Sequence, residues 1–256
     1  MDMPHELSDF TPALQFLERE PDQNLMLIRS LRSGPRHGFA VIVDDPADMH
    51  ALMAVTRPDW KKPTTLPMTL QIDASDRDVA LRLLSWLPVG PRYRIRSYRS
   101  WLQDLVHSLL QVDRQSHMVH CLATTGAFHP YRLGEQVREI DRQEQDLRDS
   151  AMRMLTVSGV SRLFGMVEGG QLMAFSTLAQ PDTDYVTVQT VYTRESARSK
   201  GLGRAVLSAA TEAGLAIGKI VSFGLPAEDL PALRMLAGLG FVPACREWTL
   251  EGVVGQ

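Results

Sequence analysis

Residues 191–204 read VYTRESARSKGLGR, and this stretch joins a strand to a helix through a glycine-containing turn. The residues before the turn, 185–193, are rich in Val, Thr and Tyr and predict a strand. After the turn, apolar residues recur at helical spacing from Leu202 to Ile217. The turn itself carries the pattern Arg-x-x-Gly-x-Gly at residues 198–203. The sequence therefore predicts a strand–turn–helix unit centred on two glycines.

This turn has the properties of an anion site. Glycine lets a backbone approach a ligand closely, and the first N–H groups of a helix have no acceptor within the helix. Arg198, Lys200 and Arg204 add positive charge at the same place. The spacing differs from the Walker loop and from the dinucleotide fingerprint, which needs a third glycine and a later acidic residue. We therefore predict a diphosphate cradle that is neither of these two.

Composition limits the other classes of function. The chain has 256 residues, 44% of them hydrophobic and 22% charged, which suits one large domain or two ordinary ones. The net charge of -3 and the pI near 6.2 argue against a general nucleic-acid binder. No apolar run approaches the roughly 20 residues that span a bilayer, and the acidic start lacks the apolar core of a signal peptide. We expect a cytoplasmic protein that binds neither nucleic acid nor membrane.

Cysteine and histidine usage gives no sign of a metal or disulfide framework. Cys121 and Cys245 are far apart in the sequence, and neither lies in a metal-type spacing. The histidines at 117, 120 and 129 also lack a metal-binding spacing. We predict no metal site and no disulfide.

The first half of the chain predicts a complete set of alternating elements. Apolar periodicity indicates helices at 11–18, 24–32, 76–86 and 100–111, and strands at 38–43, 51–56, 68–72, 93–97 and 117–123. Residues 126–131, which contain Gly and Pro, resemble a linker.

The second half predicts a similar order. We expect helical structure at 133–155, 201–217 and 230–238, and strands at 162–168, 172–179, 185–193, 219–223 and 246–251. Glu168-Gly169-Gly170 indicates a hairpin turn. We infer a structural duplication with domains at 1–125 and 126–256, and a mixed α/β fold whose predominantly antiparallel central sheet is flanked by helices.

The matching strand–helix junction of the first half differs in chemistry. Residues 71–77 contain no glycine and no basic cluster. We expect the side chain of Asp73 or Ser75 to cap that helix and to fill the place that an anion would take. The first half is therefore predicted not to bind a phosphate.

At this point the chain resembles the GNAT superfamily of N-acyltransferases. Val191-Tyr-Thr193 followed by Arg198-x-x-Gly-x-Gly203 is similar to the family's coenzyme A motif. Leu230 to Phe241, which reads LPALRMLAGLGF, looks like a second landmark of the family, a helix followed by Gly-Phe. The resemblance covers about residues 130–251 and is most like the FR47-like, glycine N-acyltransferase-like branch, in which a degenerate GNAT half precedes a functional one. It implies a tandem GNAT-like fold.

The resemblance implies that acetyl-CoA, or another acyl-CoA, is the co-substrate. The pantetheine arm would pair with the edge of strand 185–193. The diphosphate would lie on the helix N-terminus. The residues expected to bind the co-substrate are Val191, Tyr192, Thr193, Arg198, Ser199, Lys200, Gly201, Leu202, Gly203 and Arg204.

Two positions depart from the family pattern. The family's thiolate-protonating tyrosine falls at Leu236, and its asparagine falls at Asp229. Tyr192 is the nearest alternative acid, although strand alternation can direct it away from Val191. Asp184, at the start of the strand, is the candidate base, with a solvated turn residue as the simpler interpretation.

The sequence therefore predicts an N-acetyltransferase that moves an acetyl or short acyl group from coenzyme A to an amine by direct attack in a ternary complex. The acceptor would be a small molecule, an amino acid or a peptide, and the protein a monomer or homodimer. Leu236 keeps open a non-catalytic acyl-CoA-binding sensor or interaction module. A nucleotide-phosphate binder is a third reading, and it predicts ATP or NAD binding that acetyl-CoA does not displace.

Overall fold

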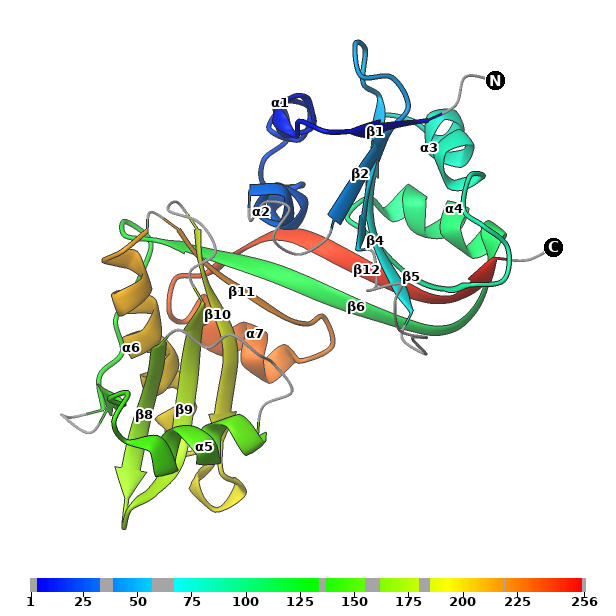
Figure 1. Cartoon of the computed structure of the whole chain (residues 1–256). Coiled ribbons are helices and arrows are strands. Elements are labelled where there is room, and N and C mark those ends of the chain that lie inside the picture. The colour runs from blue at the N-terminus through cyan, green and yellow to red at the C-terminus, as the bar shows by residue number, and fades with distance from the viewer. Residues whose placement is uncertain are drawn as a thin grey trace. The chain divides into compact units, whose positions relative to one another are not determined.

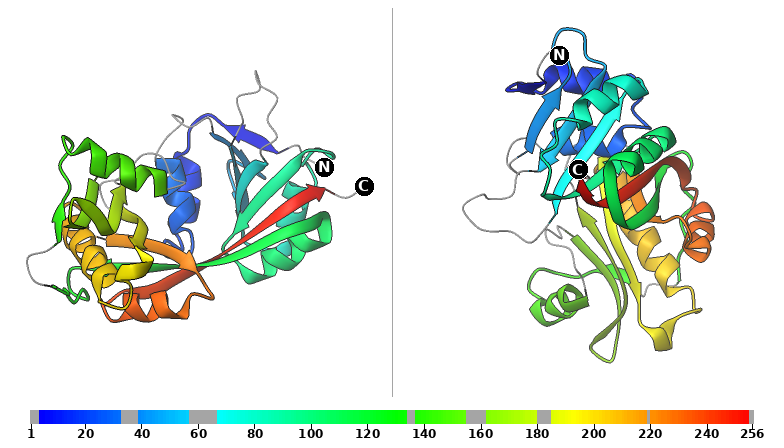
Figure 2. Two further views of the ribbon diagram at one scale, coloured as in Figure 1. Left: turned by 90° about the horizontal axis from the view of Figure 1, so that it is seen from below. Right: turned by 90° about the vertical axis from the view of Figure 1, so that its right-hand side faces the viewer.

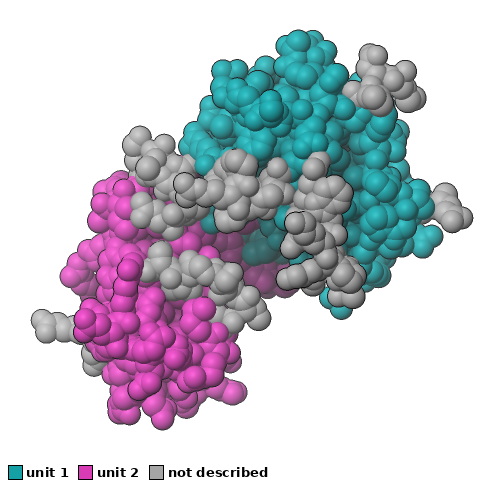
Figure 3. Space-filling view, in the orientation of Figure 1, with its two compact units in different colours: residues 1–119, 244–256 teal, residues 120–243 magenta. Residues whose placement is uncertain are grey.

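The structure is a computed structural model that describes residues 4–32, 39–56, 67–133, 137–154, 162–179, 185–218 and 220–254. The chain folds into two compact units. Unit 1 comprises residues 1–119 and 244–256, and unit 2 comprises residues 120–243 (Figure 3). The last segment of the chain thus belongs to the unit that the N-terminus begins. Among the described residues, no helix combines the length and the apolar character needed to cross a membrane.

Unit 1 is built from an almost fully antiparallel set of strands (Figure 1). Its elements are β1 (His5–Leu7), α1 (Thr11–Leu17), α2 (Leu25–Arg32), β2 (Phe39–Val43), β3 (Ala51–Thr56), β4 (Met68–Ala74), α3 (Arg77–Leu84), β5 (Arg92–Ser97), α4 (Ser100–Leu109) and β6 (Leu110–Thr124), whose end lies in unit 2. The strand order is β1-β2-β3-β4-β5-β12-β6, in which β4 and β5 are parallel and β12 is the final strand of the chain, Val242–Val254.

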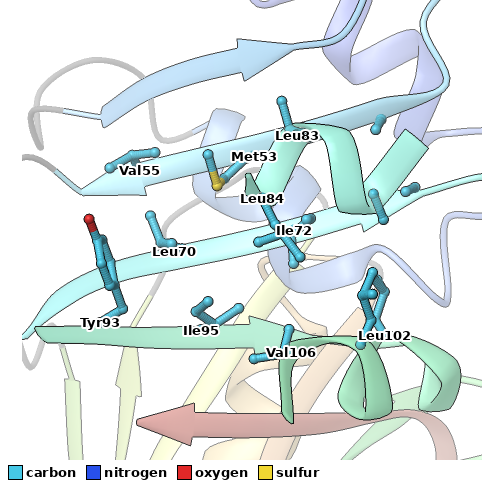
Figure 4. Packing of buried hydrophobic residues seen from close by; sticks show 14 of the residues in the cluster. Met53, Val55, Leu70, Ile72, Leu83, Leu84, Tyr93, Ile95, Leu102 and Val106 are labelled. Carbon is cyan, nitrogen blue, oxygen red and sulfur yellow. The ribbon is translucent and has the colours of Figure 1, made fainter. Parts of the chain in front are cut away.

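The central strands of unit 1 carry apolar side chains on both faces, and helices cover both faces. On β3, Met53 packs into one core cluster with α3 and α4, while its neighbour Leu52 packs into another with α1 and α2. Figure 4 shows the first cluster, where Leu83 and Leu84 of α3 lie over the strands that carry Met53 and Ile72. Unit 1 is therefore a three-layer α/β/α arrangement.

The α3 junction corrects one prediction about capping. Asp76 is the N-cap of α3, and its carboxylate accepts hydrogen bonds from the N–H groups of Asp78 and Val79, both at 3.0 Å. Asp73, which the sequence favoured together with Ser75, is instead buried and ion-paired with Arg99. A side chain does occupy this helix end, but it comes from the residue directly before the helix.

Unit 2 contains β7 (Val137–Glu139), α5 (Gln145–Met154), β8 (Arg162–Glu168), β9 (Gln171–Ala179), β10 (Tyr185–Thr193), the 3-10 turn η2 (Glu195–Ala197), α6 (Leu202–Leu215), β11 (Ile220–Pro226) and α7 (Leu230–Ala237). Its strand order is β6-β11-β10-β9-β8-β7. Helix α5 lies on one face of these strands and α6 on the other (Figure 2, right). The mixed α/β fold with a mostly antiparallel sheet is confirmed.

The prediction of helical structure over 133–155 is partly wrong. Residues 137–139 form β7, which pairs antiparallel with β8, and the helix begins only at Gln145. The turn between them is held by Glu144, whose carboxylate accepts from the Asp141 N–H at 2.8 Å and from Arg138. Ion pairing and strand pairing thus override the apolar spacing that suggested helical structure from residue 133. The hairpin at Glu168-Gly169-Gly170 is confirmed, with both glycines at positive φ.

Candidate functional site

The strand that precedes the glycine turn separates from its neighbour halfway along. β10 pairs in parallel with β11 only from Tyr185↔Ile220 to Val188↔Phe223, although β10 continues to Thr193. On its other side β10 stays paired with β9 as far as Thr193, with a bulge at Gln189. Residues 189–193 therefore offer main-chain groups along an edge that β11 does not occupy.

Side chains alternate across the unpaired end of β10. Val191 packs with Leu202 and Val206 of α6, whereas Tyr192 packs on the opposite face with residues beside α5. The Tyr192 ring stacks on Phe175, with ring centroids 5.3 Å apart. Strand alternation thus directs Tyr192 away from the face that α6 covers, as its spacing from Val191 indicated.

The turn after β10 is fixed to the sheet before it reaches α6. The Arg194 N–H donates to the carbonyl of Met173 at 2.9 Å, and the Ala197 side chain is buried. Ser199 and Gly201 both have positive φ, 62° and 78° respectively. The chain thus takes the left-handed conformation twice in the turn, directly before the first residue of α6.

The N-terminus of α6 has no side-chain cap. Gly201 is its N-cap residue, and the first intrahelical bond runs from the Ala205 N–H to the Gly201 carbonyl at 3.0 Å. The N–H groups of Leu202, Gly203 and Arg204 precede that bond and point out of the helix end. A side chain at Gly203 would place its Cβ 2.9 Å from Thr193 Oγ1, so glycine lets the helix start lie against the strand. With its dipole, this end of α6 favours an anion.

The three predicted basic residues are placed differently. Lys200 is exposed, and the Arg198 Nε donates to the Thr193 carbonyl at 3.4 Å. Arg204 instead reaches α7, where its Nη2 donates to the Gly238 carbonyl at 2.7 Å, and its guanidinium lies 4.5 Å from the centre of the Tyr131 ring. Arg198 and Lys200 are therefore both exposed at the turn, where Arg198 also bonds the end of β10, while the Arg204 side chain bonds α7.

The structure gives no new support to the predicted proton-transfer residues. Asp184 lies outside the described residues. Leu236 is 1% exposed in α7 and is a core residue, and Asp229 caps α7 by accepting from the Ala232 N–H at 3.1 Å. No group of three or more His, Cys, Asp or Glu side chains in the described ranges is arranged to hold a metal ion.

Two features of the site were not predicted from the sequence. Tyr131 brings its hydroxyl next to Gly201, although the two residues are far apart in the chain. At the β10 bulge, the Gln189 Oε1 atom is buried without a hydrogen-bond partner among the described residues, as are the hydroxyls of Ser176 and Thr177 on β9. A bulge and a cross-chain contact leave no periodic signal, so only the fold reveals them.

Comparison with known families places this geometry in context. Residues 128–241 match the sequence model of the acetyltransferase (GNAT) family, so the match covers most of unit 2. No curated protein sequence matches the chain. The FR47-like branch is not distinguished by this match.

Solved structures show the same fold over the whole chain. A GCN5-related N-acetyltransferase from Sphaerobacter thermophilus is 10% identical and covers 99% of this chain and 96% of its own, with a TM-score of 0.68. A GNAT-family acetyltransferase from Colwellia psychrerythraea is 12% identical and covers 98% and 100%, with a TM-score of 0.61. A tandem GNAT protein from the clavulanic acid biosynthesis pathway is 14% identical and covers 99% of each chain, with a TM-score of 0.54. The fold of the chain is thus that of GNAT proteins, some of them tandem.

Proposed function

We propose that unit 2 is an N-acetyltransferase domain that binds acetyl-CoA or another short acyl-CoA and transfers the acyl group to an amine. The observation that carries the proposal is the uncapped N-terminus of α6 directly beside the unpaired end of β10. The match of residues 128–241 to the acetyltransferase family supports it.

The residues present fit the co-substrate. The N–H groups of residues 199–204 suit a diphosphate, and Arg198 and Lys200 supply positive charge on the exposed side of the turn. The edge of β10 at 189–193 suits the pantetheine arm, whose amides pair with a main chain as a peptide would. Val191 and Thr193 are the residues we assign to that pairing.

Main-chain groups carry most of the chemistry that we propose. Bound acyl-CoA supplies a thioester carbonyl. We assign the role of donor to that oxygen to a β10 N–H near Val191, in the part of the strand that does not pair with β11. One such donor contributes roughly 3 kcal/mol in known oxyanion holes. The reaction needs no tyrosine at position 236, because thiols with a pKa of about 8.5 are adequate leaving groups as thiolates.

Leu236 also favours the second candidate function, a non-catalytic acyl-CoA sensor or interaction module. Its side chain is buried and has no proton to give, so the helix that carries the acid in the family's pattern carries none here. Both functions require the same α6 cradle. Turnover, and not binding, separates them.

For the whole chain we propose tandem GNAT-like domains with sequence bounds 1–125 and 126–256, the first of them degenerate, as in the FR47-like branch, although residues 244–256 pack in unit 1. Asp76 supports this, because its carboxylate already occupies the N-terminus of α3. We propose that the protein is cytoplasmic and is a monomer or a homodimer. One chain already supplies two GNAT-like units, so a second copy is not required.

The proposal is tested by measuring release of free CoA thiol from acetyl-CoA across a panel of small amines, amino acids and peptides. We expect turnover with at least one acceptor. The double substitution Arg198→Ala/Lys200→Ala should weaken acetyl-CoA binding about tenfold, since each exposed charge contact contributes up to about 1 kcal/mol. Arg77→Ala, at the start of the capped helix α3, is the control and should change nothing. Tight CoA binding without turnover on any acceptor would favour the sensor instead.

A further inference from the structure

Tyr131 is hydrogen-bonded to α6, the helix whose N-terminus forms the cradle. Its backbone N–H donates to the Ser208 hydroxyl on α6 at 2.8 Å, and Ser208 is 2% exposed. This bond holds the main chain of Tyr131 alongside α6, well outside the glycine motif.

The phenol of Tyr131 reaches the start of that helix. Its hydroxyl lies 2.6 Å from the point where a Cβ on Gly201 would stand, and none of the described residues hydrogen-bonds to it. Gly201 is thus required for two reasons: its φ of 78° disfavours a side chain, and the Tyr131 hydroxyl fills the space that a side chain would take. A hydroxyl without a partner among the described residues thus lies at the start of α6.

Arg204 lies over the Tyr131 ring. Its guanidinium lies 4.5 Å from the centre of the Tyr131 ring and donates to the Gly238 carbonyl at 2.7 Å. Its Nε is buried without a hydrogen-bond partner in the described part of the chain. The Arg204 guanidinium can orient the Tyr131 ring by a cation–π contact, and it adds positive charge near the start of α6, where an anion would bind.

We propose that the Tyr131 hydroxyl donates a hydrogen bond to the diphosphate of bound coenzyme A, with Arg204 as the residue that positions the ring. The inference rests on the proposed function of unit 2. It adds a side-chain donor from a distant part of the chain to a cradle otherwise made of main-chain N–H groups. A hydroxyl donating to a charged phosphate oxygen forms a strong, short hydrogen bond.

The test compares three ligands on the full chain. Tyr131→Phe keeps the ring and its stacking on Arg204 and removes only the donor. By isothermal titration calorimetry, we expect its Kd to rise about tenfold for both CoA and 3′-dephospho-CoA, which both carry the diphosphate. Ligand-observed NMR should show an unchanged Kd for acetyl-pantetheine, which lacks the diphosphate. Tyr93→Phe, which removes a hydroxyl bonded to the Pro88 carbonyl in unit 1, is the matched control and should alter none of the three.

The outcomes separate this inference from the function on which it rests. If the wild-type chain binds none of the three ligands, the proposed function is overturned and the inference with it. If the wild-type chain binds CoA and Tyr131→Phe binds it equally well, the inference alone fails. It also fails if the variant weakens acetyl-pantetheine by the same factor, which marks a packing effect. A loss for CoA that 3′-dephospho-CoA does not share moves the hydroxyl to the ribose phosphate and overturns the diphosphate assignment.

Discussion

Single residues decide whether the backbone of unit 2 can take the shape that the site needs. Ser199 adopts positive φ without being glycine, which costs roughly 1–2 kcal/mol and implies that its surroundings impose the turn. Gly201 and Gly203 could be predicted from the sequence as a motif. Their reasons could not, since Tyr131 and Thr193 fill the space beside them only in the fold.

Gly240, in the segment Leu230 to Phe241, is likewise required by a contact that only the fold reveals. It has a φ of 85°, and a Cβ there would lie 1.7 Å from the Ala127 carbonyl oxygen. Gly240→Ala should therefore lower the free energy of unfolding by about 2–5 kcal/mol, combining the left-handed strain with the clash. Urea denaturation measures it. Gly126→Ala, where no atom lies within 4 Å of the new Cβ, is the control. Equal stability of the two variants would contradict this close approach.

At the scale of elements, periodicity predicted most helices and strands, and short-range charge caused the main error. β2 to β5 and β8 to β10 follow their apolar patterns closely, whereas β1 was not predicted and β6 begins at Leu110, before the predicted start at 117. β7 does not, because a strand of three residues is too short to show a period, and its pairing with β8 comes from the fold. The separation of β10 from β11 and the bulge at Gln189 are likewise set by pairing, which no single strand's sequence encodes.

The ion pair that ends β7 makes a prediction about pH. Arg138 donates to both carboxylate oxygens of Glu144, at 2.7 and 2.6 Å, and with the Asp141 N–H it lowers the Glu144 pKa from 4.5 to about 2. A lowered pKa stabilises the fold above pH 4.5, and this contribution is lost as the pH falls towards 2.

A carbon-detected NMR titration of the Glu144 carboxylate should therefore show a midpoint near 2 in the wild-type chain. Arg138→Ala should move the midpoint back towards 4.5, while Arg142→Ala, a nearby exposed arginine, should leave it in place. A wild-type midpoint at the ordinary glutamate value would show that the pair does not persist in solution.

At the scale of the whole molecule, unit 1 is not continuous in sequence, because it contains both the N-terminal part and the last segment of the chain. β12 follows α7 of unit 2 in sequence, yet it pairs with β5 from Trp248↔Ser97 to Val253↔Arg92. Glu251 on β12 is ion-paired with Arg92 and Arg94 on β5. The sequence predicted a strand here, but which strand it would join depends on contacts between residues far apart in the chain.

A core substitution in β12 should therefore destabilise unit 1. Leu250 is 2% exposed and packs in the same cluster as Ile72, Ile95 and Val106. Leu250→Ala should cost about 2–5 kcal/mol, as buried leucine truncations do. Hydrogen exchange measured by mass spectrometry should show lost protection in β4, β5 and α4. Val242→Ala, at the exposed start of the same strand, should change little. Loss confined to α6 and β10 would contradict the assignment of β12 to unit 1.

The central claim is that acyl-CoA binds at the N-terminus of α6. The most direct measurement is a backbone amide NMR titration of the full chain with acetyl-CoA. The two helix starts provide an internal comparison, because Asp76 already caps α3 while Gly201 leaves α6 uncapped. We predict the largest shifts at residues 189–193 and 198–204, with the amides of Asp78 and Val79 unmoved. No shift at Leu202 to Arg204, or equal shifts at Asp78 and Val79, would contradict the claim.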